Sequence, residues 1–133
     1  TYVLLSDGEL AEGSNWEAFL FAAHHKLDNL IAIVDYNKLQ SLTSVEKTLN
    51  IEPIGDKMRA FGWSVTEVDG HNLEELVNSF EAAKEDKNNQ PKIVICHTIK
   101  GKGVSFMENK VQWHYKSPSS EEYEMAKAEI LNA

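Results

Sequence analysis

Four short apolar runs recur along the chain, and longer segments with helical character separate them. The runs cover residues 2–5, 30–35, 63–68 and 92–98. Strands that alternate with helices predict a parallel sheet with helices packed against it. Residues 93–95 are all β-branched, which is typical of a central strand that is covered on both faces. We therefore expect an α/β fold: a three-layer, doubly wound parallel sheet with helices on both faces.

The segments between and after the runs predict four helices. These helices cover residues 15–26, 53–62, 73–84 and 119–131. The first is apolar on almost every side, so we expect it to be buried all round or to form part of an interface. Residues 100–118 show no long period, and an irregular segment of that length is more often functional than filler.

The composition limits the classes of function that the chain can have. Of the 133 residues, 42% are apolar and 26% are charged, so residues 1–133 suit a single soluble domain. The chain starts inside a strand and without Met, so we expect these residues to be part of a larger domain. Thirteen basic residues against 21 acidic ones give a net charge of −8, which argues against a nucleic-acid or anionic-membrane surface. No apolar stretch approaches the roughly 20 residues of a membrane helix. The single Cys96 predicts a buried core residue and a reducing compartment, the cytoplasm.

Two oxygen-bearing side chains follow the first two apolar runs. Asp7 lies just after the first run and Asn37 just after the second. The carboxyl ends of parallel strands lie at one edge of the sheet, where open α/β sheets bind ligands. Mg²⁺ takes such oxygens and fills its other positions with phosphates and water. We therefore expect Asp7 and Asn37 to meet over one cation and one phosphate group, in a turn completed by Gly8 and Glu9. The alternative left open is that Asp7 caps a helix and Asn37 caps a turn.

The sequence around these residues resembles the diphosphate-binding domain of transketolases. The shared strings are residues 6–13, 16–18, 27–30, 35–38, 60–63, 69–71 and 98–103. The block from Asp7 to Asn37 is the specific thiamine-diphosphate signature, whereas the later strings are shared with relatives such as deoxyxylulose-phosphate synthase. The likeness is greatest to the short amino-terminal subunits of split transketolases.

The resemblance implies a cofactor and a metal with named ligands. Asp7 and Asn37 would bind Mg²⁺, or Ca²⁺ or Mn²⁺ in its place, by their side chains, and Leu39 would bind it by its carbonyl oxygen. Gly8 and Glu9 would lie against the diphosphate of thiamine diphosphate. These assignments agree with the metal and phosphate expected from the two strand ends.

Further site residues are implied by the resemblance alone. His114 would reach the cofactor and the substrate hydroxyls, and Glu12 and Glu17 match an acidic cluster that links the two active sites across the dimer. The alternatives left open are a solvated loop histidine and favourable charge in a first helical turn. Ser6 stands where the family has glycine, so a positive φ there would weaken cofactor binding. His71 is expected to be a turn residue whose ring satisfies backbone groups.

The resemblance also implies a reaction and partners. Transketolases transfer a two-carbon ketol unit from a ketose phosphate to an aldose phosphate, as in the pentose phosphate pathway. The glutamate that activates the cofactor belongs to a pyrimidine-binding domain, so we expect a partner that supplies this domain, in a homodimer or heterotetramer, and no catalysis by this chain alone. The alternatives are a related enzyme such as deoxyxylulose-phosphate synthase, a non-catalytic scaffold of this fold and, remotely, a phosphoacceptor receiver domain using Asp7, Asp35 and Lys100.

Overall fold

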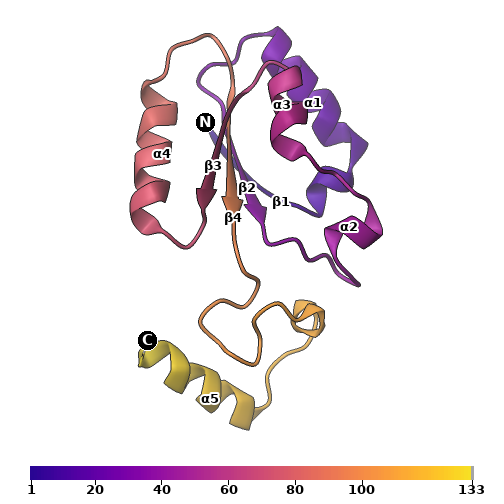
Figure 1. Ribbon diagram of the computed structural model, residues 1–133, viewed down its shortest axis with the longest axis vertical. Helices are drawn as coiled ribbons and strands as arrows, with labels where there is room; N and C mark the ends of the chain where they lie inside the picture. The colour runs from indigo at the N-terminus through magenta and orange to yellow at the C-terminus, as the bar shows by residue number, and fades with distance from the viewer. Residues whose placement is uncertain (133) are drawn as a thin grey trace.

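A computed structural model describes residues 1–132, and its centre is a four-stranded parallel sheet (Figure 1). The strands are β1 (Tyr2–Ser6), β2 (Ile31–Tyr36), β3 (Ser64–Asp69) and β4 (Lys92–His97). They lie in the order β1-β2-β4-β3, and each neighbouring pair is parallel. The expected α/β class is confirmed, with each predicted run forming one strand.

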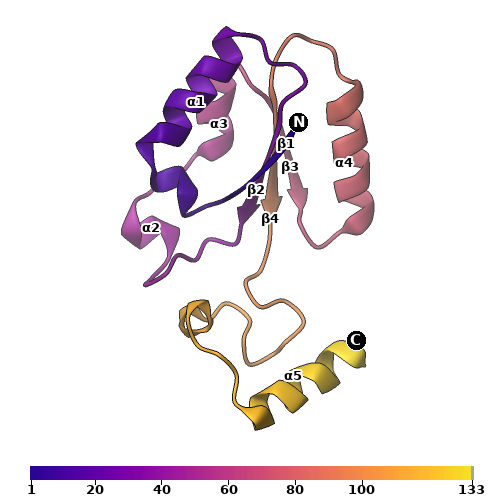
Figure 2. The ribbon, with the colours of Figure 1, turned by 180° about the vertical axis from the view of Figure 1, so that it is seen from behind.

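Helices cover both faces of the sheet. The helices are α1 (Gly13–His24), α2 (Val45–Thr48), α3 (Ile54–Ala60), α4 (Leu73–Glu85) and α5 (Ser120–Leu131), with two 3-10 helices, η1 (Glu9–Ala11) and η2 (Val111–His114). α1 and α3 lie on one face and α4 on the other, while α5 lies beyond the carboxyl ends of the strands (Figures 1 and 2). None of the helices within residues 1–132 has the length and apolarity that a membrane crossing requires.

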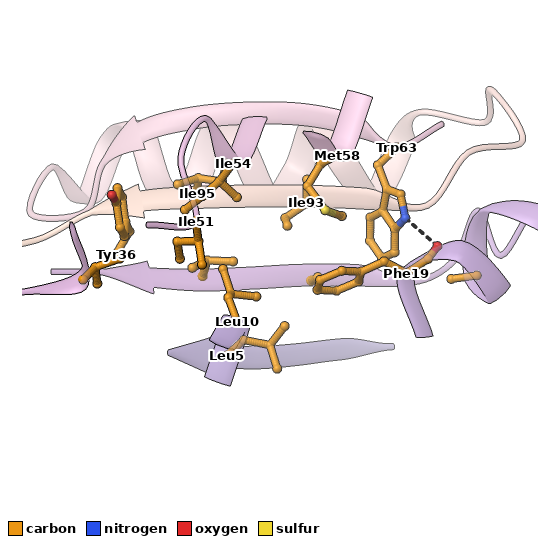
Figure 3. Close-up of a cluster of buried hydrophobic side chains, with 14 residues drawn as sticks. Leu5, Leu10, Phe19, Tyr36, Ile51, Ile54, Met58, Trp63, Ile93 and Ile95 are labelled. Atoms are coloured by element: carbon orange, nitrogen blue, oxygen red, sulfur yellow. Dashed lines mark hydrogen bonds between the residues drawn. The ribbon is translucent and has the colours of Figure 1, made fainter. Parts of the chain in front are cut away.

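The larger core fills the space between the sheet and the helices α1 and α3 (Figure 3). The indole N–H of Trp63 donates to the carbonyl of Phe19 at 2.9 Å, and the two rings meet edge to face with centroids 5.3 Å apart. Met58 and Ile93 are fully buried beside them. This packing fixes α1, and with it the segment between β1 and α1, against the sheet.

A smaller core lies under α4 and buries the second face of β4. Val94 and Cys96 are buried there, and Leu76 and Phe80 of α4 pack against them. The run 93–95 is therefore covered on both faces, as its β-branched sequence predicts. Burial raises the pKa of the Cys96 thiol, which is the inert core residue expected from the sequence.

Helix α1 is not buried on all sides, so the prediction of complete burial is wrong. Phe19 and Ala22 are buried, whereas Leu20 and Phe21 are 52% and 61% exposed. An apolar pattern on every side does not tell which side the rest of the fold covers. Here α1 is contacted by η1 and by Phe61 and Trp63, which leaves Leu20 and Phe21 exposed. The other expectation, an interface, stays a prediction that fits the exposed apolar side chains.

Candidate functional site

The segments that follow β1 and β2 are tied together at the carboxyl edge of the sheet. The Asp7 N–H donates to the Asp35 carbonyl at 3.3 Å. The Asp7 Oδ2 accepts from the Lys38 N–H at 2.7 Å. Lys38 stands between Asn37 and Leu39 in the chain, so the structure brings the three predicted metal ligands to one place.

Asp7 is a buried carboxyl, only 2% exposed. Burial raises its pKa, the N–H of Lys38 lowers it in part, and the nearby charge of Asp35 raises it again. No Lys, Arg or His side chain within residues 1–132 forms an ion pair with Asp7. The N–H groups of Lys38 and Gly8 and the charge of Lys100 lower the pKa of Asp7 only in part. A bound cation would stabilise the charged form further, so this position suits one.

Asn37 and Leu39 add neutral oxygens beside this carboxylate. The Asn37 Oδ1 accepts from the Leu39 N–H at 2.9 Å, so Asn37 makes the turn that the alternative interpretation describes. The Asp7 side chain does not cap η1, so the alternative prediction that Asp7 caps a helix is wrong. An amide oxygen has two lone pairs, and the turn uses one of them. Within residues 1–132 no hydrogen bond ends on the Leu39 carbonyl, which leaves it open to a cation.

The protein donors alone do not form a complete metal cage. No cluster of three or more His, Cys, Asp and Glu side chains that could hold a metal occurs in the described part of the chain. One carboxylate and two neutral oxygens are instead a partial set. Such a set is typical of Mg²⁺ sites in which the remaining positions belong to phosphate oxygens and water.

A groove of about 330 Å³ lies over these oxygens and gathers residues from distant segments. It is lined by Ser6, Asp7, Gly8, Glu9, Glu12, Asn37, Leu39, Gln40, Ser41 and His114. Every residue predicted to bind the cofactor or the metal is in this lining, and so is Glu12. Glu17 is not: it lies on α1, outside the groove.

Gly8 leaves a space in the groove that the protein does not fill. Its backbone, with φ −65° and ψ −36°, suits any residue. A Cβ at this position would find no atom nearer than the Ser6 Oγ at 3.8 Å and the Gln40 Cγ at 3.9 Å. Neither the backbone nor the packing of the chain requires glycine here, so the space over Gly8 fits a ligand that lies against the main chain.

Ser6, which the resemblance places where glycine is expected, carries no backbone strain. It is the last residue of β1, and it is not among the described residues with positive φ. Its N–H donates to the Glu9 Oε2 at 2.8 Å and its hydroxyl donates to the same oxygen at 3.0 Å. The N–H and then the hydroxyl of Ser6 lower the pKa of Glu9. The serine therefore fixes the Glu9 carboxylate at the groove.

The loop after β4 carries His114 to the groove. The Ile99 N–H donates to the His71 Nε2 at 2.8 Å, which confirms the structural role expected for His71. Further along, the Trp113 indole N–H donates to the Phe106 carbonyl at 3.1 Å. These bonds fold the loop back so that η2 places the exposed His114 at the groove wall.

Sequence reasoning missed two residues of the groove, Gln40 and Ser41. Both follow the predicted ligand Asn37 by a few positions, which is the one signal that could have drawn attention to them. The Gln40 Nε2 is buried and has no hydrogen-bond partner among residues 1–132. Whether a side-chain amide finds a hydrogen-bond partner depends on three-dimensional geometry, so a sequence pattern cannot reveal it.

Fold and site together define a ligand-binding α/β domain whose groove lies at the carboxyl edge of a parallel sheet. Residues 1–130 match the family model for the transketolase thiamine diphosphate binding domain. The chain belongs to this family, which confirms the resemblance and makes the receiver-domain alternative wrong.

Individual relatives agree with this assignment. One of the apulose-4-phosphate transketolase subunits of Phocaeicola vulgatus is 43% identical over 130 residues, which are 98% of this chain and 46% of the relative. The 6-deoxy-6-sulfo-D-fructose transketolase subunit SqwG of Clostridium is 43% identical over 129 residues, covering 97% of this chain and 46% of the relative. A solved transketolase from Campylobacter jejuni matches with a TM-score of 0.90 and 32% identity, over 97% of this chain and 20% of that one. The chain spans about half the length of these two curated relatives.

Proposed function

We propose that this chain binds Mg²⁺ and the diphosphate of thiamine diphosphate within a transketolase. The enzyme would transfer a two-carbon ketol unit from a ketose phosphate to an aldose phosphate. The observation that carries the proposal is the common groove: Asp7, Asn37, Leu39 and His114 come from three separate segments and line one space, in a chain of this family.

The oxygens of the groove suit a hard divalent cation. The Asp7 carboxylate, the Asn37 amide oxygen and the Leu39 carbonyl are the ligand types that Mg²⁺ takes, and Ca²⁺ or Mn²⁺ would use the same atoms. The cation would offset the buried charge of Asp7, which no side-chain ion pair balances within residues 1–132. Its remaining positions would be filled by the diphosphate and by water.

The other residues of the groove would bind and orient the ligand. The open space over Gly8 lets a diphosphate lie against the main chain, and Ser6 holds Glu9 beside it. His114 stands at the wall, where its ring can exchange hydrogen bonds with the cofactor and with substrate hydroxyls. Thiamine diphosphate, when bound, supplies the electron sink that cleavage of a carbon–carbon bond needs.

We propose that the chain acts together with a pyrimidine-binding domain or subunit, in a homodimer or heterotetramer. Two relatives of similar sequence are named as transketolase subunits. The exposed Leu20 and Phe21 on α1 provide an apolar surface for such a contact, and Glu12 and Glu17 flank the start of that helix. The two acidic residues would then act at the interface. Such a role agrees with the position of Glu17 outside the groove of a single chain.

Calorimetric titration of thiamine diphosphate into the full-length protein with its partner tests the proposal. We expect binding that requires Mg²⁺ and that is lost in Asp7→Ala. Asp56→Ala is the matched control, because Asp56 is an exposed aspartate on α3 outside the groove. Unchanged affinity in Asp7→Ala would refute the metal assignment, and a wild-type protein that binds no cofactor would favour the scaffold alternative.

A further inference from the structure

The side-chain amide of Gln40 is an unsatisfied donor in the wall of the groove. Its Nε2 is buried, and no hydrogen-bond acceptor within residues 1–132 reaches it. Buried polar groups are almost always paired, because an unpaired one loses its bonds to water and gains none in return. Within residues 1–132 this donor has no partner, and a ligand in the groove could therefore supply one.

Gln40 is part of the groove lining and lies next to Gly8. Gln40 follows the proposed ligands Asn37 and Leu39, and its main chain is fixed by the bond from its N–H to the Thr43 carbonyl at 2.8 Å. Its Cγ lies 3.9 Å from the point that a Cβ on Gly8 would occupy. The side chain thus borders the space in which the diphosphate is proposed to lie.

The groove also needs neutral donors to hold an anion. Three carboxylates, those of Asp7, Glu9 and Glu12, are part of its lining. A divalent cation can cover some oxygens of a diphosphate, but the others would face these negative charges. An amide N–H adds a hydrogen bond without adding charge, and such bonds are strong when the acceptor is ionised.

We propose that Gln40 is a positioning residue whose Nε2 donates a hydrogen bond to a diphosphate oxygen of the cofactor. The proposal rests on the proposed function and adds to it a residue that fixes the anion on the side of Gly8. Bound ligand would supply the acceptor that the chain lacks. The Gln40 amide therefore favours cofactor binding but does not stabilise the fold when no ligand is bound.

A glutamine with a purely structural role pairs its amide with the protein. Gln90 is an example in this chain, because its Oε1 accepts from the Asn88 Nδ2 at 3.0 Å. Replacing a paired glutamine removes stabilising bonds and lowers stability. Replacing Gln40 removes an unpaired donor instead, so stability and affinity should change in opposite directions.

The test compares Gln40→Met with wild type in the full-length protein with its partner. We expect an unliganded Tm equal to or above that of wild type, and affinities for thiamine diphosphate and for inorganic pyrophosphate, each with Mg²⁺, that are about tenfold weaker. Gln40→Glu keeps the shape but replaces the donor with a negative oxygen, so it should weaken both affinities further. Gln112→Met is the matched control at an exposed position outside the groove and should change neither quantity.

Four results would overturn the inference. A lower unliganded Tm with unchanged affinities would make Gln40 structural. A raised KM for the sugar phosphate with unchanged pyrophosphate affinity would assign the amide to the substrate. Asp7→Ala separates the two proposals: if it loses binding while both Gln40 variants keep it, only the role of Gln40 fails, and if wild type binds neither probe, the proposed function fails as well.

Discussion

Replacing Gly8 with alanine separates what the fold needs from what the ligand needs. The backbone at Gly8 lies in the right-handed helical region, and an added Cβ would make only ordinary contacts, at 3.8 and 3.9 Å. Alanine at such a position stabilises a protein by about 0.4–1 kcal/mol, because it reduces the freedom of the unfolded chain. For a domain of this size that gain corresponds to a rise in Tm of about 1–5 °C.

The same substitution should weaken cofactor binding. Its Cβ would occupy the space over the main chain where we expect the diphosphate to lie. We predict an affinity for thiamine diphosphate about tenfold weaker or worse, a loss of about 1.4 kcal/mol or more. Gly13→Ala is the control: a Cβ there meets no atom within 4 Å, and Gly13 lies at the start of α1 outside the groove.

Scanning calorimetry without ligand and isothermal titration with thiamine diphosphate and Mg²⁺ give the two quantities. Gly13→Ala should bind like wild type and should not lose stability. A lower Tm in Gly8→Ala would refute the reasoning about its backbone. Wild-type affinity in Gly8→Ala would show that the diphosphate does not lie against this residue.

Three further predictions concern the core and the loop after β4. Trp63→Phe should lower the free energy of unfolding in urea by about 1–3 kcal/mol, because a buried carbonyl of α1 loses its indole donor; an unchanged value would contradict this. His71→Ala should speed hydrogen exchange after β4 while the sheet stays protected, since the Ile99 N–H loses its acceptor; exchange at the wild-type rate would argue against it. The N–H and then the hydroxyl of Ser105 lower the pKa of Glu129 on α5. Their contact with the Glu129 carboxylate therefore stabilises the fold fully above the ordinary pKa of 4.5. This stabilisation is lost as the pH falls through the lower pKa of the folded state. The amide shift of Ser105 should follow that titration, and Glu129→Gln should abolish it.

The sheet could be predicted because its signal is local and repeated. Residues 93–95 are β-branched, so their burial on both faces of β4 follows from their sequence. The meeting of Asp7 and Asn37 was predictable for a related reason: one strand–helix–strand unit separates them, and parallel strands end at the same edge. Helix ends were less accurate, since α1 begins at Gly13, a poor helix former, two residues before the predicted start at 15.

Features that depend on three-dimensional contacts were not predictable. The sequence of α1 is apolar on most sides, and only the packed structure tells that Phe19 is buried while Phe21 is exposed. Likewise, the sequence alone does not reveal that Ser6 has an extended backbone and bonds to Glu9, so that its Cβ brings no strain. The unpaired amide of Gln40 arises from the conformation of one short segment, which no periodicity encodes.

The central claim is that Asp7, Asn37 and Leu39 hold a divalent cation over the diphosphate. A crystal structure of the full-length protein with its partner, thiamine diphosphate and Mn²⁺ in place of Mg²⁺ tests it directly, because Mn²⁺ can be located by its anomalous scattering. We predict one anomalous peak in the groove within coordination distance, about 2.0–2.3 Å, of the Asp7 carboxylate, the Asn37 amide oxygen and the Leu39 carbonyl. Bound cofactor with no peak there, or with a peak held by other residues, would contradict the account.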